Sequence, residues 1–381
     1  MKRTMKKMVS MALTGTMAVA VLAGAGTREV KAADKAKIGV LVADVSGEEA
    51  QGFRSYYENY IAGNYDVEFN YTDALQSAED EKTAIEKFAS QGCQAIISFS
   101  SNDRVQQIET CEKYGVYYAV ASGVLDDAQY ETYKTYEYFA GQVGPGNDTE
   151  FEAGKDMGAY YKEQGVSKVA IYGAFIPNPM HVYRVAGVLN GLGCTYGGES
   201  DMNAIAGQIF QDQTVDLSKV EGDVEVVSYL QGYGDTTTDE LNAAIQKTPD
   251  AFISVGMATT FFAQSLSEAG ISFSDIDSFT ETNGNSMKNG TLTYLAGKYS
   301  SSIGPVFALV MNAINGNVIR DEDGNAPSIS QGYLVATDSD TFDKYSVSDS
   351  GDAPIYDKET VDSIIGDNVT FEDVKTLVES K

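Results

Sequence analysis

The stretch KVAIYGAFIPNPMHVYRVAGVLNGL, residues Lys168 to Leu192, decides the fold of this chain. Its first five residues form a short apolar run typical of a buried strand, and a loop rich in glycine, proline and asparagine follows. Asn178 is expected to be a helix N-cap. Pro179 is expected to be the first helical residue, because proline lacks only an N–H that has no intrahelical partner there. The order strand, loop, amphipathic helix predicts an α/β protein with a parallel sheet.

Two polar residues at the start of this helix are candidate ligand contacts. His181 and Arg184 are three residues apart, so they share one face of the first two helical turns. That face points back toward the junction between strand and helix. Because ligands of open α/β sheets bind at the carboxyl ends of the strands, Arg184 is predicted to contact a ligand and His181 to line the cleft.

The same alternation extends over most of the chain. Apolar runs predict strands at Ile38–Ala43, Tyr65–Asn70, Gln94–Ser98, Val116–Ala121, Tyr138–Val143, Val224–Leu230, Ala251–Val255, Asp277–Thr280 and Ser328–Ala336. Helical patterns separate most of these runs, which indicates right-handed βαβ units and parallel sheets covered on both faces. The irregular segment 193–222 is expected to be a loop or short insertion near the cleft.

Length and charge restrict the classes of protein to consider. The chain has 381 residues, which predicts two domains of about 150 residues each. Its net charge of -28 argues against nucleic acid, or an anionic membrane surface, as the main partner.

The first 32 residues are typical of a secretory signal. Lys2, Arg3, Lys6 and Lys7 precede an apolar segment, and small residues around Ala32 suit a cleavage site. No second long apolar run follows, so a permanent membrane span is not predicted. We expect export to the periplasm, the cell surface or the extracellular space.

The sequence lacks the residues of common catalytic and metal sites. His181 is the only histidine, which excludes a histidine-based triad within the chain and a multi-histidine metal site. Cys93, Cys111 and Cys194 are odd in number and widely spaced, which argues against a metal site or a disulfide scaffold and leaves one disulfide open. Cys93 and Cys111 are expected to be buried apolar residues. We therefore predict no enzymatic activity, no cofactor and no metal.

Several longer stretches carry a resemblance when taken in order. They are SAEDEKTAIEKFASQGCQAII at Ser77–Ile97, FEAGKDMGAYYKEQGVSKVAIYGA at Phe151–Ala174, PDAFISVGMATTFFAQSLSEAGI at Pro249–Ile271, and NGTLTYLAGKYSSSIGPVFALVMNAINGN at Asn289–Asn317. In this order the chain resembles the type I periplasmic solute-binding proteins of ABC importers, especially the ribose and galactose group. The resemblance covers nearly all of the chain after the signal segment.

The resemblance implies an α/β fold of two doubly wound parallel-sheet lobes joined by a hinge of three crossings. The crossings are expected near Gln142, Lys298 and Gly332. The first lobe would then take residues 36–142 and 299–332, and the second lobe residues 143–298 and 333–381. In such a fold, closure about the hinge buries the ligand between the lobes.

The resemblance also implies a set of ligand-binding positions. Arg184 matches the sugar-contacting arginine of the family, while Ser122 and Gly123 stand where sugar binders often carry an Asp-Arg pair. Gly256 replaces a frequent asparagine and Lys298 a glutamine. The remaining positions that the resemblance implies are Asp44, Ser46, Glu48 and Glu49 in the first turn and Glu281 in a later loop. Apart from the resemblance, His181 is expected to line the cleft, and Phe175, Tyr183 and Tyr233, at junctions of strand, loop and helix, are candidate stacking rings.

The changes at these positions suggest a second hypothesis about the ligand. Arg184 and Lys298 together would make the cleft locally positive, which suits a carboxylate or phosphate group. In the alternative, Lys298 pairs with Glu48, Glu49 or Glu281 across the cleft.

The predicted function is that of a monomeric binding protein that delivers a small polar solute, a sugar or sugar derivative, to the permease subunits of an ABC importer. Two alternatives stay open. Residues 176–192 also resemble the nucleoside binders of the basic-membrane-protein type, and a sensor that docks on a membrane receptor would share the same fold.

Overall fold

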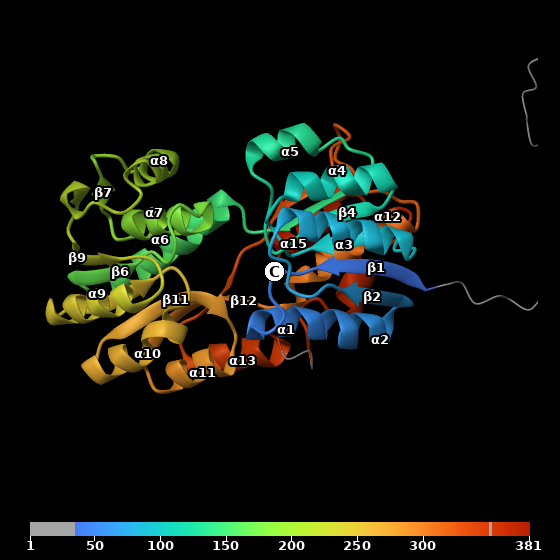
Figure 1. The fold of residues 1–381 in the computed structure, drawn as a ribbon. Helices are drawn as coiled ribbons and strands as arrows, with labels where there is room; N and C mark the ends of the chain where they lie inside the picture. The colour runs from blue at the N-terminus through green and yellow to red at the C-terminus, as the bar shows by residue number, and fades with distance from the viewer. Residues whose placement is uncertain (1–34, 350–352) are drawn as a thin grey trace, which may run out of the picture. The chain divides into compact units, whose positions relative to one another are not determined.

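Two six-stranded sheets organise the computed structural model, which describes residues 35–349 and 353–381 (Figure 1). The first sheet comprises, in spatial order, β13 (Ser328–Ser330), β5 (Phe139–Gly144), β4 (Tyr117–Ala121), β3 (Ala95–Ser98), β1 (Ala36–Leu41) and β2 (Val67–Tyr71). All neighbouring strands in it are parallel. The predicted signal segment, 1–32, lies outside the described residues.

The second sheet comprises β14 (Leu334–Ala336), β12 (Leu292–Lys298), β11 (Ser272–Ser278), β10 (Ala251–Ser254), β6 (Lys168–Tyr172) and β9 (Glu225–Leu230). Only β14 runs antiparallel to its neighbour. Each sheet with its helices is called a lobe below. The predicted α/β class with two doubly wound sheets is confirmed.

Helices cover both sheets. The first lobe carries α1 (Glu48–Ser55), a π-helical segment (Tyr56–Ile61), α2 (Ala62–Asn64), α3 (Ala78–Ser90), α4 (Arg104–Tyr114), α5 (Asp127–Tyr133) and α12 (Gly304–Ile314). The second lobe carries α6 (Asn147–Glu163), α7 (Pro179–Gly191), α8 (Met202–Asp212), α9 (Asp235–Gln246), α10 (Ala258–Ala269), α11 (Glu281–Lys288) and α13 (Ser339–Asp349). The remaining elements are two short 3-10 turns, Leu217–Lys219 and Ser300–Ile303, and a two-stranded ribbon formed by β7 (Thr195–Tyr196) and β8 (Val220–Glu221).

The stretch Lys168–Leu192 folds as its pattern predicts. The strand ends at Tyr172, and α7 begins at Pro179, whose preceding residue Asn178 accepts a hydrogen bond from the Met180 N–H at 3.1 Å. Helices α6 and α7 pack closely. A Cβ placed on Gly154 would lie 2.0 Å from the Arg184 carbonyl oxygen, so this crossing requires glycine.

Three local predictions need correction. Residues 193–222, expected to be a loop or a short insertion near the cleft, are not a loop, since they contain the helix α8, which buries Ile205, Ala206 and Ile209 at helical spacing. Ser328–Ala336 is not one strand, since it divides into β13 in the first sheet and β14 in the second. The strand expected at Asp277–Thr280 begins earlier, at Ser272. The polar residues Ser274 and Asp275 hide this start in the sequence, because they are buried although strands are recognised by apolar residues.

The C-terminal residues differ from the expected lobe assignment of 333–381. Helix α13 packs against α11 in the second lobe, but α14 (Lys358–Asp362) and α15 (Phe371–Glu379) pack against α12 and β13 of the first. The Asn312 side chain donates to the Ile364 carbonyl oxygen at 2.8 Å, and the Tyr56 hydroxyl donates to the Tyr356 carbonyl oxygen at 2.6 Å. The tail therefore returns to the first lobe (Figure 1).

Two further sequence expectations concern the cysteines and membrane insertion. Cys93 and Cys111 are buried free thiols, as predicted, and Cys194 is also free and buried. Among residues 35–349 and 353–381, no helix has the length and apolar character that crossing a membrane requires.

Candidate ligand-binding site

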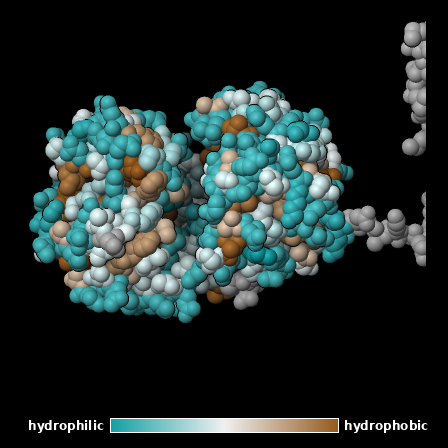
Figure 2. Space-filling view, viewed as in Figure 1, coloured by the Kyte–Doolittle hydropathy of each residue, from teal (hydrophilic) through white to brown (hydrophobic). Residues whose placement is uncertain are grey.

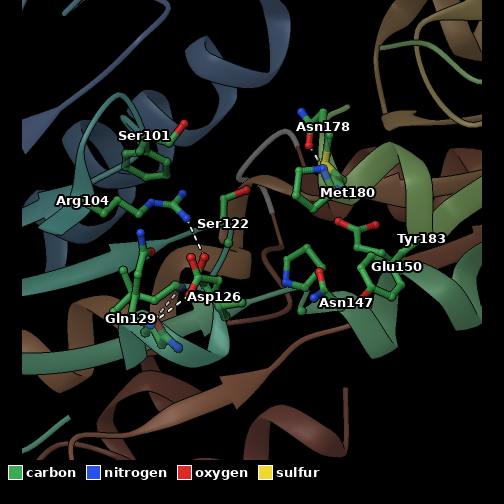
Figure 3. Close-up of a pocket in the computed structure, with 18 of the residues that line it drawn as sticks. Ser101, Arg104, Ser122, Asp126, Gln129, Asn147, Glu150, Asn178, Met180 and Tyr183 are labelled. Atoms are coloured by element: carbon green, nitrogen blue, oxygen red, sulfur yellow. Dashed lines mark hydrogen bonds between the residues drawn. The ribbon is translucent and has the colours of Figure 1, made fainter. Parts of the chain in front are cut away.

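A cavity of about 1020 Å³ lies where the carboxyl ends of the first-lobe strands face the start of α6 and α7. Figure 2 shows the surface of the described residues hollowed between the two lobes. In Figure 3, one wall carries side chains of the first lobe and the opposite wall those of the second: Ser101, Arg104, Ser122, Asp126 and Gln129 on one side, Asn147, Glu150, Asn178, Met180 and Tyr183 on the other. Both lobes therefore contribute to one polar site.

The structure places five of the predicted site residues around this cavity: Asp44, Glu49, Ser122, Gly123 and Lys298. Glu48 and Glu281 line a smaller neighbouring cavity of about 310 Å³, which Glu49 and Lys298 also border. Arg184, His181 and Gly256 are buried within the second lobe and do not line the larger cavity. Ser46, Phe175 and Tyr233 do not line it either.

Asp44 follows β1 and shapes the turn before α1. Its carboxylate accepts hydrogen bonds from the Ser46 N–H at 2.9 Å and the Gly47 N–H at 3.0 Å. The bond from the Ser46 backbone is the main cause of the lowered pKa of Asp44, and it outweighs the opposing effect of burial. The Ser46 hydroxyl also donates to this carboxylate, at 3.0 Å. Ser46 thus holds the carboxylate of Asp44, which lines the cavity, in place.

The loop after β3 is held by a buried carboxylate. Glu81 on α3 accepts from the Ser100 hydroxyl at 2.5 Å and from the backbone N–H groups of Asn102 and Asp103, both at 2.9 Å. Burial alone would raise the pKa of Glu81, but these hydrogen bonds lower it overall, so the group is a carboxylate at neutral pH. Glu81 therefore fixes the loop that presents Ser101 and Asn102 to the cavity.

Arg104, which the sequence analysis did not select, is the first residue of α4. Its Nη1 donates to the Val124 carbonyl oxygen at 2.6 Å, and the guanidinium points toward Ser122 (Figure 3). Burial lowers the pKa of Arg104. The sequence gives no signal for it, because a lone arginine at the start of a helix looks like an ordinary surface residue.

The backbone is strained just after three strands. Ser122 after β4, Ala174 after β6 and Met257 after β10 have φ of +56°, +52° and +67°, values that disfavour residues with a Cβ. Such strain clusters at ligand-binding sites in proteins. Of the three residues, Ser122 lines the cavity.

Arg184 is fully engaged within the second lobe. Its Nε lies 2.6 Å from Oε2 of Glu150, its Nη1 donates to the Val255 carbonyl oxygen at 2.8 Å, and its Nη2 donates to the Tyr333 hydroxyl at 2.7 Å. Glu150, not Arg184, lines the cavity. The positive charge of this arginine is thus balanced by a carboxylate that stands between it and the cavity.

Lys298 is also paired. Its Nζ lies 3.3 Å from a carboxylate oxygen of Glu49, which accepts a further hydrogen bond from the Ser278 hydroxyl at 2.9 Å. The alternative in which Lys298 pairs across the cleft is therefore confirmed for Glu49. Both cations of the positive-cleft hypothesis have protein carboxylates as partners.

His181 is buried and bonded to the backbone of Phe175, with Nδ1 3.0 Å from both the N–H and the carbonyl oxygen. Burial, assisted by the nearby Arg184 cation, lowers the pKa of His181 to about 4. The imidazole is therefore neutral at pH 7, and Nδ1 accepts a hydrogen bond from the Phe175 N–H.

Of the candidate stacking rings, Tyr183 lines the cavity, whereas Phe175 and Tyr233 do not. Phe175 and Tyr233 are 49% and 47% exposed, and the Tyr233 ring packs 5.3 Å from Phe261. The other rings that line the cavity are Phe53, Tyr71, Phe99, Tyr130 and Phe210, and all of these except Phe99 lie in helices or strands.

Residues 35–349 and 353–381 contain no cluster of histidine, cysteine and carboxylate side chains that could hold a metal ion. The arrangement of the cavity instead suits a ligand with many hydroxyl groups. Amide, hydroxyl and carboxylate groups bond to hydroxyls as donors and acceptors, and aromatic rings cover apolar ring faces.

Neither a protein-family model nor a curated protein matches this chain. Several solved structures are similar to it. The arabinose-binding protein of an ABC transporter from Shewanella sp. ANA-3 is 16% identical, with a TM-score of 0.58 over 83% of this chain and 96% of its own. A solute-binding protein from Actinobacillus succinogenes with bound D-allose gives a TM-score of 0.61 at 16% identity, over 82% and 100%. The myo-inositol binding protein of Caulobacter gives 0.59 at 14%, over 83% and 97%.

These similarities concern the fold. The chain has the two-lobe architecture of type I periplasmic binding proteins, as the sequence resemblance predicted.

Proposed function

We propose that this chain is a non-catalytic, extracytoplasmic solute-binding protein of an ABC importer, and that it holds a sugar or sugar derivative in the cavity between its lobes. One observation carries the proposal: polar side chains of both lobes face each other across a cavity of about 1020 Å³. Cavities of several hundred Å³ with a few convergent polar groups are typical ligand sites.

The connections between the lobes support a hinge. The chain passes between the lobes after β5, after β12, between β13 and β14, and again between α13 and α14. Gln142 on β5 donates to the Ser328 hydroxyl at 2.8 Å, so two of these connections are tied to each other at the cavity. A ligand that bonds to both walls would favour the closed arrangement of such lobes, which a permease is then able to recognise.

The solutes bound by the similar structures guide the choice of compounds. L-Arabinose, D-allose and myo-inositol are the first to try, followed by sugar acids and by nucleosides for the alternative function. Because a ligand that binds only the folded chain stabilises it by about 2.7 kcal/mol at a hundredfold excess over Kd, thermal unfolding reports binding directly.

We expect a rise in Tm with a sugar or polyol. A rise with nucleosides alone would favour the nucleoside-binding alternative. If no small solute raises Tm, the proposal is contradicted.

A further inference from the structure

Arg104 has hydrogen-bond donors to spare inside the cavity. Nη1 donates to the Val124 carbonyl oxygen at 2.6 Å. In the part of the chain that the structure describes, Nε is buried without an acceptor, and no hydrogen bond uses Nη2. Because a guanidinium has five N–H donors and stays charged in proteins, the two donors of Nη2 and the second donor of Nη1 are left for another molecule.

The other two cations around the cavity, Arg54 and Lys298, each pair with a carboxylate of the chain. Arg54 donates through Nε and Nη2 to the Glu58 carboxylate, both at 3.0 Å, and Lys298 pairs with Glu49. Arg104 takes no part in the ion pairs of the described residues. It is thus the cavity cation that lacks a carboxylate partner, and a partly buried unpaired charge is costly without a ligand.

Gly123 makes room for this guanidinium. A Cβ added at Gly123 would lie 3.1 Å from Nη2 of Arg104 and 3.6 Å from Nη1. The shorter of these contacts is tighter than ordinary van der Waals packing, so a residue with a Cβ would force the guanidinium to shift by a few tenths of an ångström. The glycine therefore keeps Arg104 beside Ser122 at the wall of the cavity.

The charges around the cavity indicate which ligand Arg104 takes. Carboxylates outnumber cations among its lining residues, with Asp44, Glu49, Asp103, Asp126, Asp127, Asp148 and Glu150 against Arg54, Arg104 and Lys298. An acidic lining repels an anion, whereas carboxylates accept hydrogen bonds from hydroxyl groups. The cavity thus favours a neutral ligand with many hydroxyls over a sugar acid.

We propose that Arg104, rather than Arg184, is the arginine that anchors the ligand, through hydrogen bonds from its free N–H groups to the oxygens of a neutral sugar or polyol. This inference rests on the proposed function. Ser122 and Gln129 stand on the same wall (Figure 3) and supply further partners for neighbouring hydroxyls. Arg184 keeps the second lobe folded and does not contact the ligand.

L-Arabinose, D-allose, myo-inositol and D-galactose are first compared by the rise that each causes in the Tm of the wild type. Calorimetry then measures the affinity of each variant for the compound with the largest rise. The affinities of the wild type for D-galactose and D-galacturonate are measured in the same way. The variants are Arg104→Gln, Arg104→Lys and the control Lys155→Gln. Lys155 lies on α6 outside the cavity lining and forms an exposed ion pair with Glu152. Unliganded Tm of each variant shows that it is folded.

We expect Arg104→Gln to weaken binding of the neutral compound at least tenfold, since a hydrogen bond from a charged group is worth about a factor of ten or more. Arg104→Lys should weaken it as well, because lysine lacks the planar fork. Lys155→Gln should stay within about threefold of the wild type, because it removes only an exposed ion pair outside the cavity.

Wild-type affinity in the Arg104→Gln variant would overturn the inference and leave the proposed function intact. So would binding of D-galacturonate more tightly than D-galactose. If none of the compounds binds the wild-type chain, the proposed function fails, and the inference fails with it.

Discussion

Arg184 and Glu150 form an ion pair inside the second lobe, with the arginine Nε 2.6 Å from Oε2 of the glutamate and side chains that are only 3% and 4% exposed. The pair forms because glycines at the contact of α6 and α7 let these helices approach closely. An arginine that looks like a ligand contact in the sequence is therefore part of the lobe interior.

Replacing one partner of this pair should destabilise the chain strongly. Arg184→Ala leaves the Glu150 carboxylate buried without its cation, which costs about 3–5 kcal/mol. Urea unfolding measures the loss. The control is Lys155→Ala, since Lys155 forms an exposed pair with Glu152 and its removal should cost less than about 1 kcal/mol. Equal unfolding midpoints for Arg184→Ala and the wild type would contradict the assigned role.

Tyr333 links this pair to the connection between β13 and β14. Its hydroxyl accepts from Arg184 at 2.7 Å and donates to Glu150 at about 3 Å. Tyr333→Phe keeps the ring but removes these bonds, so we expect a loss of about 1–3 kcal/mol. Amide hydrogen exchange should also become faster in residues 331–336. Unchanged exchange there would show that the hydroxyl does not hold the connection.

His181 should make stability depend on pH. Burial lowers its pKa in the folded chain to about 4, whereas the ordinary pKa of a histidine side chain, which applies in the unfolded chain, is 6.5. The unfolded chain therefore binds the proton more readily, so His181 stabilises the fold above pH 6.5 and loses this contribution as pH falls toward 4. The loss amounts to about 3 kcal/mol.

The measurement compares urea unfolding of the wild type and His181→Gln between pH 7.5 and 4. Because His181 is the only histidine, the difference between the two curves isolates it from the carboxylates. Parallel curves over this range would contradict the assignment.

Gly123→Ala should weaken ligand binding without unfolding the chain. The added methyl group would lie 3.1 Å from Nη2 of Arg104 and push the guanidinium away from the cavity wall. We expect an affinity loss of several-fold, measured by calorimetry, and a Tm close to that of the wild type. Gly146→Ala is the matched control, because the nearest atom to its new Cβ is 3.7 Å away. Equal effects of both substitutions would argue against displacement of Arg104.

The architecture could be predicted from the sequence because apolar strands and capped helices alternate with a clear period. Asn178 and Pro179 fixed the start of α7, and the buried strand Ala95–Ser98 needed no tertiary information. Helix α8 was missed since its apolar residues are interleaved with glutamine, asparagine and glycine. The start of β11 was placed too late because the carboxylate of Asp275 is buried only through tertiary packing.

The candidate site was less predictable than the fold. Position along the chain placed Asp44, Ser122 and Lys298 near the cavity, since each follows or ends a strand at the carboxyl edge of its own sheet. It did not reveal that Glu150 would pair with Arg184, or that Glu81 would hold the loop before Arg104. Such partners are distant in sequence, and their pairing depends on how helices pack.

Amide hydrogen exchange with and without the best-binding solute tests the central claim most directly, because it locates the ligand on the chain. The account predicts slower exchange in residues 99–104, 122–130 and 178–183, which line the cavity from both lobes. Protection confined to one lobe, or to residues 278–281 and 298–300 at the smaller cavity, would contradict it.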